Sequence, residues 1–164
     1  SNQIMCIWLQ THKLTGKLGK HILVYGASCL NNFTGELYMI EGQKDYKMDI
    51  TTFDAWERFV STYNPSETII VYDNEDDKIF PYLDKICQFS GIETDTVHYY
   101  NHQEKTVMNC LKQTYMKAII DNLYNLNLYD SCAEFSTYQV ATQSMCFLLN
   151  FIREHDSKIA EKIK

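Results

Sequence analysis

An acidic run at residues 73–77 offers the densest cluster of chemically useful side chains in this 164-residue sequence. It follows the apolar segment Ile69–Val71, and α/β proteins often place ligands at the end of such a strand. Carboxylates from Asp73 and Asp77 could hold a divalent cation. Lys78 stands where an EF-hand loop requires glycine, so the run favours a solvated loop between a strand and a helix.

Two histidines, His98 and His102, have the four-residue spacing that binds zinc when both lie on one helix. Here His98 falls in an expected strand and His102 in the following loop, with no cysteine or carboxylate at a suitable interval. The adjacent Tyr99 and Tyr100 are expected to pack into the core. The six cysteines form no C-x-x-C pair, and the sequence lacks phosphate-loop and dinucleotide motifs. The sequence therefore predicts no catalytic, cofactor-binding or metal-binding residue in this segment.

The net charge of −6 argues against a surface whose main task is to grip nucleic-acid phosphates. Lys13, Lys17 and Lys20 cluster, but intervening glycines favour a solvated hairpin turn. No apolar run approaches the roughly 20 residues of a membrane helix, and no signal-peptide pattern opens the chain. Unpaired cysteines are typical of reduced, intracellular proteins. We expect an intracellular chain with no membrane contact and little or no DNA binding of its own.

The expected elements begin with three strands in an antiparallel meander, followed by alternating helices and strands and then by helices alone. The strands are expected at 4–9, 21–28, 35–41, 66–72 and 94–100, and the main helices at 53–63, 79–89 and 136–153. This order predicts an α/β fold with a ribonuclease H-like, mixed five-stranded sheet flanked by helices. The same order also permits other α/β folds.

A ribonuclease H-like nuclease needs carboxylates on neighbouring strands to hold its metal ions. Residues 26–35 contain no Asp or Glu, and Asn31 is a poor replacement for a metal-binding carboxylate. Two alternatives to a purely positional role remain open. One is a degenerate metal-dependent nuclease that uses Asp73 or Asp77, and the other is a stand-alone adaptor of the same fold class.

Three segments resemble the connector domain of MutS-family DNA mismatch repair proteins. Residues 31–38 (NNFTGELY) are similar to that family's Asp-x-Ser-Thr-Gly-like turn between strands. Residues 59–70 (FVSTYNPSETII) resemble its helix followed by an x-Pro-x-Glu-x-Leu/Ile strand entrance. Residues 141–153 (ATQSMCFLLNFIR) resemble its last connector helix. Residues 52–70 and 141–153 especially resemble a divergent MutS subgroup of large DNA viruses and some mitochondria.

The resemblance implies that residues 1–164 are a single connector domain excised from a larger MutS-like protein. Such a module links the mismatch-binding domain to the lever and ATPase parts and offers a surface to a MutL-type partner. It implies no enzymatic activity and no cofactor in this segment, while the parent would use ATP and magnesium and bind mismatched DNA. A viral or mitochondrial origin would fit.

The last helix carries the predicted partner surface. Its apolar residues are expected to face the sheet, which would leave Gln143, Asn150 and Arg153 on an exposed stripe. We expect this stripe to contact a partner or a neighbouring domain.

Overall fold

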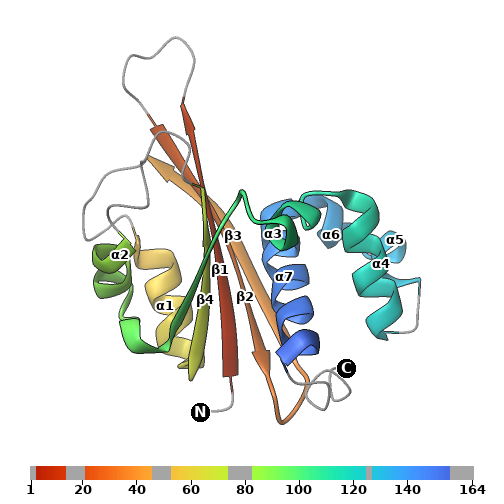
Figure 1. The fold of residues 1–164 in the computed structure, drawn as a ribbon, viewed down its shortest axis with the longest axis horizontal. Helices are drawn as coiled ribbons and strands as arrows, with labels where there is room; N and C mark the ends of the chain where they lie inside the picture. Colours follow the sequence, from red (N-terminus) through yellow and green to blue (C-terminus); the bar gives the residue numbers. More distant parts are fainter. Residues whose placement is uncertain (1–2, 14–20, 46–52, 74–82, 125–126, 156–164) are drawn as a thin grey trace.

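The computed structural model describes residues 3–13, 21–45, 53–73, 83–124 and 127–155. Five strands form one sheet in the order β3-β2-β1-β4-β5 (Figure 1). The strands are β1 (Gln3–Lys13), β2 (His21–Asn31), β3 (Leu37–Asp45), β4 (Glu67–Tyr72) and β5 (Val97–Asn101). The helices are α1 (Asp54–Tyr63), α2 (Leu83–Ser90), α3 (Lys105–Asn109), α4 (Gln113–Tyr124), α5 (Leu128–Ser131), α6 (Ala133–Thr137) and α7 (Gln139–His155), with a 3₁₀ turn, η4 (Thr94–Thr96).

The sheet is mixed, as the alternation of elements predicts. β1 pairs antiparallel with β2, and β2 pairs antiparallel with β3. β4 runs parallel to β1, and β5 runs parallel to β4. The prediction of a five-stranded mixed sheet flanked by helices is therefore confirmed. Three strands extend beyond their predicted bounds, because β1, β2 and β3 end at Lys13, Asn31 and Asp45.

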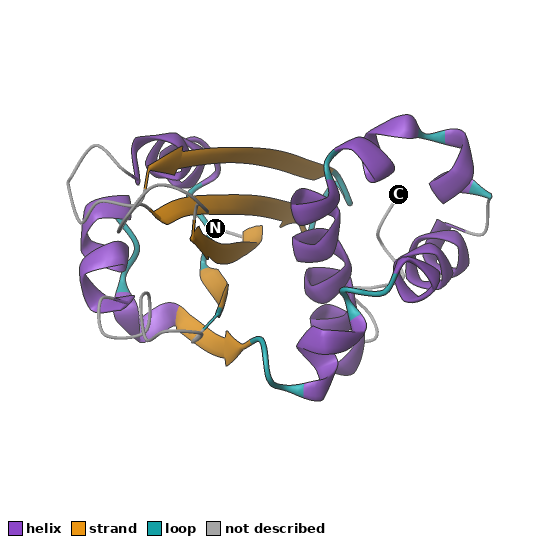
Figure 2. Ribbon diagram, turned by 90° about the horizontal axis from the view of Figure 1, so that it is seen from above, coloured by secondary structure: helices purple, strands orange, loops and turns teal. Residues whose placement is uncertain are grey.

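Helices cover both faces of the sheet, and a further helical layer lies outside one of them (Figure 2). α1 and α2 pack on one face, where Trp56, Ile70 and Ile86 belong to a common core. α7 packs on the other face, and α4 to α6 lie beyond it. Alternate residues of β1 serve the two cores, as strand geometry requires: Ile7 faces α1, while Trp8 faces α7.

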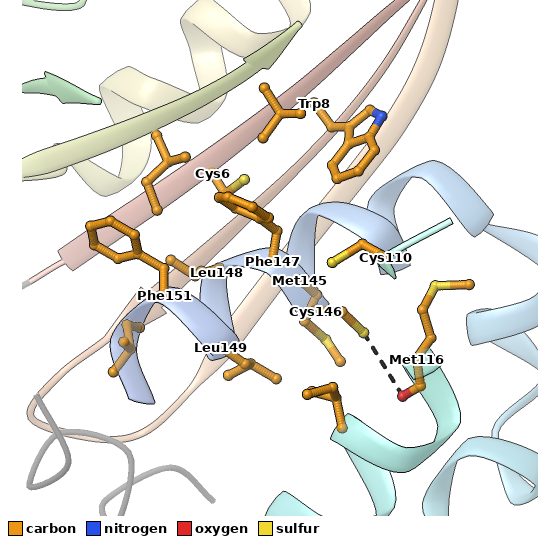
Figure 3. Close-up of a cluster of buried hydrophobic side chains, with 14 of the residues drawn as sticks. Cys6, Trp8, Cys110, Met116, Met145, Cys146, Phe147, Leu148, Leu149 and Phe151 are labelled. Atoms are coloured by element: carbon orange, nitrogen blue, oxygen red, sulfur yellow. Dashed lines mark hydrogen bonds between the residues drawn. The ribbon is translucent and has the colours of Figure 1, made fainter. Parts of the chain in front are cut away.

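The core beneath α7 is built around aromatic and sulfur-containing side chains (Figure 3). Trp8 of β1 packs edge-on against Phe147 of α7, with ring centroids 6.5 Å apart. Tyr100 of β5 meets the same phenylalanine at 5.0 Å. Within the described ranges, no helix is both long enough and apolar enough to cross a membrane.

Local hydrogen bonds and backbone conformation explain the turns in two of the segments compared above with the MutS family, residues 31–38 and 59–70. The Asn31 side chain accepts hydrogen bonds from the backbone N–H groups of Phe33 and Thr34, at 2.9 and 3.2 Å. Gly35 then adopts φ +74°, a conformation that favours glycine. Asn64 ends α1 in the left-handed region, with φ +45°, and Pro65 follows it.

A buried hydrogen-bond chain joins α1 to α2. The Trp56 indole donates to the Ser90 hydroxyl, which donates in turn to the Ile86 carbonyl at 2.6 Å. Trp56 and Ser90 are both fully buried. Removing the Ser90 hydroxyl would leave the buried indole N–H of Trp56 without a hydrogen-bond acceptor.

We therefore expect Ser90→Ala to lower the free energy of unfolding by about 2 kcal/mol. Urea denaturation followed by tryptophan fluorescence measures the change. Ser131→Ala is the control, because the Ser131 hydroxyl makes the same kind of backbone bond on the exposed surface and should cost at most about 0.5 kcal/mol. Equal losses in the two variants would contradict the role given to the Trp56 bond.

Candidate functional site

The outer edge of β3 is flanked by two hollows, one on each face of the sheet. Among the described strands, β3 has β2 as its only neighbour. Tyr38 and Ile40 of β3 pack toward α1, while Leu37 and Met39 pack toward α7. An edge strand leaves alternate backbone N–H and C=O groups directed outward, where another extended chain can pair with them.

A hollow of about 410 Å³ lies beside this edge on the α1 face. We call it the α1-side hollow. Its lining includes Tyr25, Ile40, Ala55, Arg58, Phe59 and Tyr63. The phenol ring of Tyr25 lies across Gly42, where an added Cβ would come within 2.6 Å of the ring carbon Cζ. Burial raises the pKa of Tyr25, partly offset by the Arg58 guanidinium, so the phenol is neutral at physiological pH.

A second hollow of about 430 Å³ lies beside the same edge on the opposite face. We call it the α7-side hollow. It is lined by Met39, Ile40, Glu41, Glu134, Tyr138 and Ala141. Tyr138 presents an exposed aromatic face there, with 48% of its surface accessible. Ile40 belongs to both linings, so the two hollows flank one position of the strand.

Glu41 fixes the position of α7 relative to β3. Its carboxylate oxygen Oε1 accepts hydrogen bonds from the backbone N–H groups of Val140 and Ala141, at 2.6 and 3.0 Å. A carboxylate at a helix N-terminus satisfies unpaired N–H groups and the helix dipole. This contact holds one wall of the α7-side hollow against the strand.

The carboxyl ends of β1 and β4 gather residues that the sequence singles out. Asp73 is buried and accepts hydrogen bonds from the Thr11 backbone N–H at 2.7 Å and from its hydroxyl at 3.2 Å. The His102 ring lies 5.0 Å from Trp8, and burial lowers the pKa of His102 to about 4. Residues 74–77 of the acidic run, and Lys17 and Lys20, lie outside the described residues.

The two histidines do not share a site. His98 lies 5.4 Å from the Phe151 ring and 4.0 Å from a Glu67 carboxylate oxygen, whereas His102 packs on Trp8. In the described ranges, no three His, Cys, Asp or Glu side chains gather in a way that could hold a metal ion.

All six cysteines are free thiols, and five of them are buried. Burial raises the pKa of Cys29 and Cys110 to about 12, and it raises those of Cys6 and Cys146 as well. Thiols in this state are poor nucleophiles.

The predicted exposed stripe on the last helix is wrong at two of its three positions. Gln143 and Asn150 are buried, with 9% and 6% of their surfaces accessible, and Arg153 is exposed. The reason is that α4 and α6 pack on the side of α7 turned away from the sheet, so every residue from Ala141 to Ile152 is buried. Arg153 donates to the Asn150 amide oxygen at 2.8 Å. A role for Arg153 in partner binding stays a prediction.

Sequence reasoning missed the β3 edge as a site. Its walls come from β3, α1 and the α6–α7 junction, which are far apart in the chain. The alternation of side chains along residues 37–41 was the one local signal, and it predicts a strand without saying that its edge is flanked by hollows.

No protein-family model matches the sequence, and no curated protein matches it. Among solved structures, one similar chain is the Aquifex aeolicus member of the Ppx/GppA protein family. The two chains have 9% sequence identity and a TM-score of 0.39, over 66% of this chain and 38% of the other. This chain thus spans well under half the length of that protein, and similarity at this level carries no activity to it.

The resemblance to MutS-family proteins is not borne out: neither a family model nor a curated protein matches the sequence, and the similar solved chain described above belongs to the Ppx/GppA family. The prediction of a mismatch-repair connector domain is therefore wrong. The prediction that the chain is a non-catalytic fragment of an ATP-dependent repair protein is wrong with it. The nuclease and stand-alone adaptor alternatives gain no support from the comparisons either.

Proposed function

We propose that this chain is a recognition domain that binds an extended segment of a partner protein by adding it as a sixth strand beside β3. The single observation that carries this proposal is the pair of hollows on opposite faces of one edge strand, which share Ile40. Side chains of an added strand alternate between the faces of the sheet. Successive residues of the partner would therefore enter the two hollows in turn.

The energetics of strand addition match this arrangement. Main-chain hydrogen bonds supply affinity in this mode, and hollows for alternate side chains supply specificity. Residues Leu37 to Gly42 of β3 are half-buried, and the exposed polar residues lie at its far end, from Gln43 to Asp45. The central part of the edge thus offers mainly apolar contact, and its one charged side chain, Glu41, is held by hydrogen bonds to the N-terminus of α7.

The proposal uses the chain's own backbone and side chains, and it requires neither a metal nor a cofactor. Strand order 3-2-1-4-5, with three antiparallel strands followed by two parallel ones, supports assignment to the ribonuclease H-like class. The free thiols support a reducing, intracellular setting. A viral or mitochondrial origin rested on the overturned resemblance and is not carried forward.

The test is binding of a peptide of about seven residues, the usual length of an edge strand. The probe alternates leucine and valine at its centre with threonine at its ends, and titration calorimetry measures its affinity. A twin peptide with N-methyl groups on alternate amides keeps the side chains and removes one row of hydrogen-bond donors. Two such twins are possible, because either row of alternate amides can be methylated. We expect the unmodified peptide to bind, and the twin whose methyl groups lie on the edge that pairs with β3 to lose at least tenfold in affinity. Equal binding of the peptide and both possible N-methyl twins would overturn strand addition.

Tyr138→Ser provides a matched test on the protein side. Tyr138 is exposed, so the substitution spares the core while removing the aromatic wall of the α7-side hollow. We expect peptide affinity to fall roughly tenfold, about the contribution of one aromatic contact. Phe33→Ser is the control, because Phe33 is 78% exposed and lines neither hollow. A larger loss in Phe33→Ser than in Tyr138→Ser would place the binding elsewhere.

A further inference from the structure

The two hollows beside β3 carry opposite charges. Arg58 lines the α1-side hollow, whereas Glu41 and Glu134 line the α7-side hollow. A strand that enters both hollows would thus meet a cation on one face and carboxylates on the other.

Arg58 is available to a ligand. It is exposed on α1, and within the described part of the chain it forms no ion pair, although Asp54 lies one helical turn before it. Its backbone carbonyl accepts a hydrogen bond from the Thr62 hydroxyl at 2.7 Å, while its guanidinium lies near enough to Tyr25 to lower the pKa of that phenol. Five N–H donors in a planar fork favour a carboxylate partner.

Glu134 is the available charge on the opposite face. It is exposed, and the Cys132 thiol donates to its carboxylate at 3.0 Å. That hydrogen bond lowers the pKa of Glu134, so the carboxylate stays ionised at neutral pH. Glu41 adds a second carboxylate to this lining, although its Oε1 already accepts two bonds from α7.

We infer that the partner segment is a strand with its charges sorted by face, with an acidic residue directed to Arg58 and a basic residue directed to Glu134. This inference rests on the proposed strand addition and names the chemistry of the partner. Its sequence pattern would be an alternation in which apolar and acidic residues share one face while apolar and basic residues share the other. Charge complementarity of this kind selects partners and fixes register more than it adds affinity.

Three peptides built on the leucine–valine probe test the pattern. The sorted peptide carries glutamate on one face and lysine on the other, the acidic peptide carries glutamate on both faces, and the basic peptide carries lysine on both. A one-residue slip of register exchanges the faces of a strand, so the sorted peptide always has one register that matches both hollows. Wild-type protein should prefer the sorted peptide by roughly threefold to fivefold over each of the others.

Single charge reversals in the protein should redirect this preference. Glu134→Lys makes the α7-side hollow less acidic and should shift preference toward the acidic peptide. Arg58→Glu makes both hollows acidic and should shift preference toward the basic peptide. Asp95→Lys and Lys112→Glu produce the same changes in net charge at exposed positions outside both linings, and they should leave the order of peptides unchanged.

The outcomes separate this inference from the proposed function. Binding that depends on peptide N–H groups but ignores both charge reversals would overturn the sorted-charge pattern and leave strand addition intact. Reversals that act no differently from Asp95→Lys and Lys112→Glu would overturn it as well, because they would reveal a response to net charge alone. Failure of every peptide to bind would overturn both proposals.

Discussion

Replacing Gly26 by alanine is expected to lower the free energy of unfolding by about 3 kcal/mol. Gly26 lies in β2 directly opposite Trp8 of β1, where the first turn of α7 crosses the sheet. A Cβ at this position would lie 2.5 Å from both the backbone nitrogen of Ala141 and the backbone carbonyl carbon of Val140. Backbone atoms cannot rotate away as a side chain can, so the helix would have to move off the strand.

The same displacement would disturb the candidate site. Glu41 accepts its two hydrogen bonds from Val140 and Ala141, the residues that an alanine at position 26 would displace. Gly26→Ala should therefore also weaken peptide binding at the α7-side hollow.

Urea denaturation followed by circular dichroism measures the stability change, with Gly91→Ala as the control. An added Cβ at Gly91 meets no atom within 4 Å, and its cost comes from the backbone conformation of φ +75°. That cost should be about 1 kcal/mol. If Gly26→Ala lowers the free energy of unfolding no more than Gly91→Ala does, the close contact between β2 and α7 is contradicted.

Acidification should destabilise the fold through His102. Burial lowers the pKa of His102 to about 4, below its usual value of about 6.5. Between these values the unfolded chain binds a proton at this position that the folded chain does not. Stability is therefore unaffected by this group above pH 6.5 or so and falls as the pH drops toward 4. The full pKa difference corresponds to a loss of roughly 3 kcal/mol in the free energy of unfolding. Because the His102 ring is not fully buried, we expect a loss of about 2 kcal/mol.

His102→Phe isolates this effect, because phenylalanine keeps an aromatic ring beside Trp8 and cannot take up a proton. The free energy of unfolding should be measured for both proteins at several pH values between 4 and 7. The wild-type curve should fall more steeply toward pH 4 than the variant curve, by about 2 kcal/mol over the range. Parallel curves would show that His102 titrates normally in the folded state.

The sequence predicted the sheet well because strand and helix periods are local properties. The turn at Asn31 and the helix end at Asn64 follow from side-chain capping and left-handed backbone geometry. The same rules explain why these segments resemble another family's pattern. They specify how a chain turns, and many α/β proteins need the same turns.

The burial of α7 on both of its faces could not be predicted, because its sequence looks amphipathic, as if one face were in contact with solvent. Gln143 and Asn150 have polar side chains, which usually indicate a solvated face. The layer formed by α4 to α6 covers that face, and two of its helices, α5 and α6, have only four and five residues, too few to show a helical period in the sequence. The hollows beside β3 were equally hidden, because burial against distant segments decides their shape.

The most direct test of strand addition is hydrogen exchange of the β3 backbone amides with and without the leucine–valine peptide. β3 and β5 are the two edges of the described sheet, so β5 provides an internal reference. If the peptide adds to β3, amides within Leu37–Gly42 that face outward should exchange more slowly when it is bound, while those of Val97–Asn101 keep their rates. Unchanged exchange along β3 under conditions where calorimetry shows binding, or protection at β5 instead, would contradict the account.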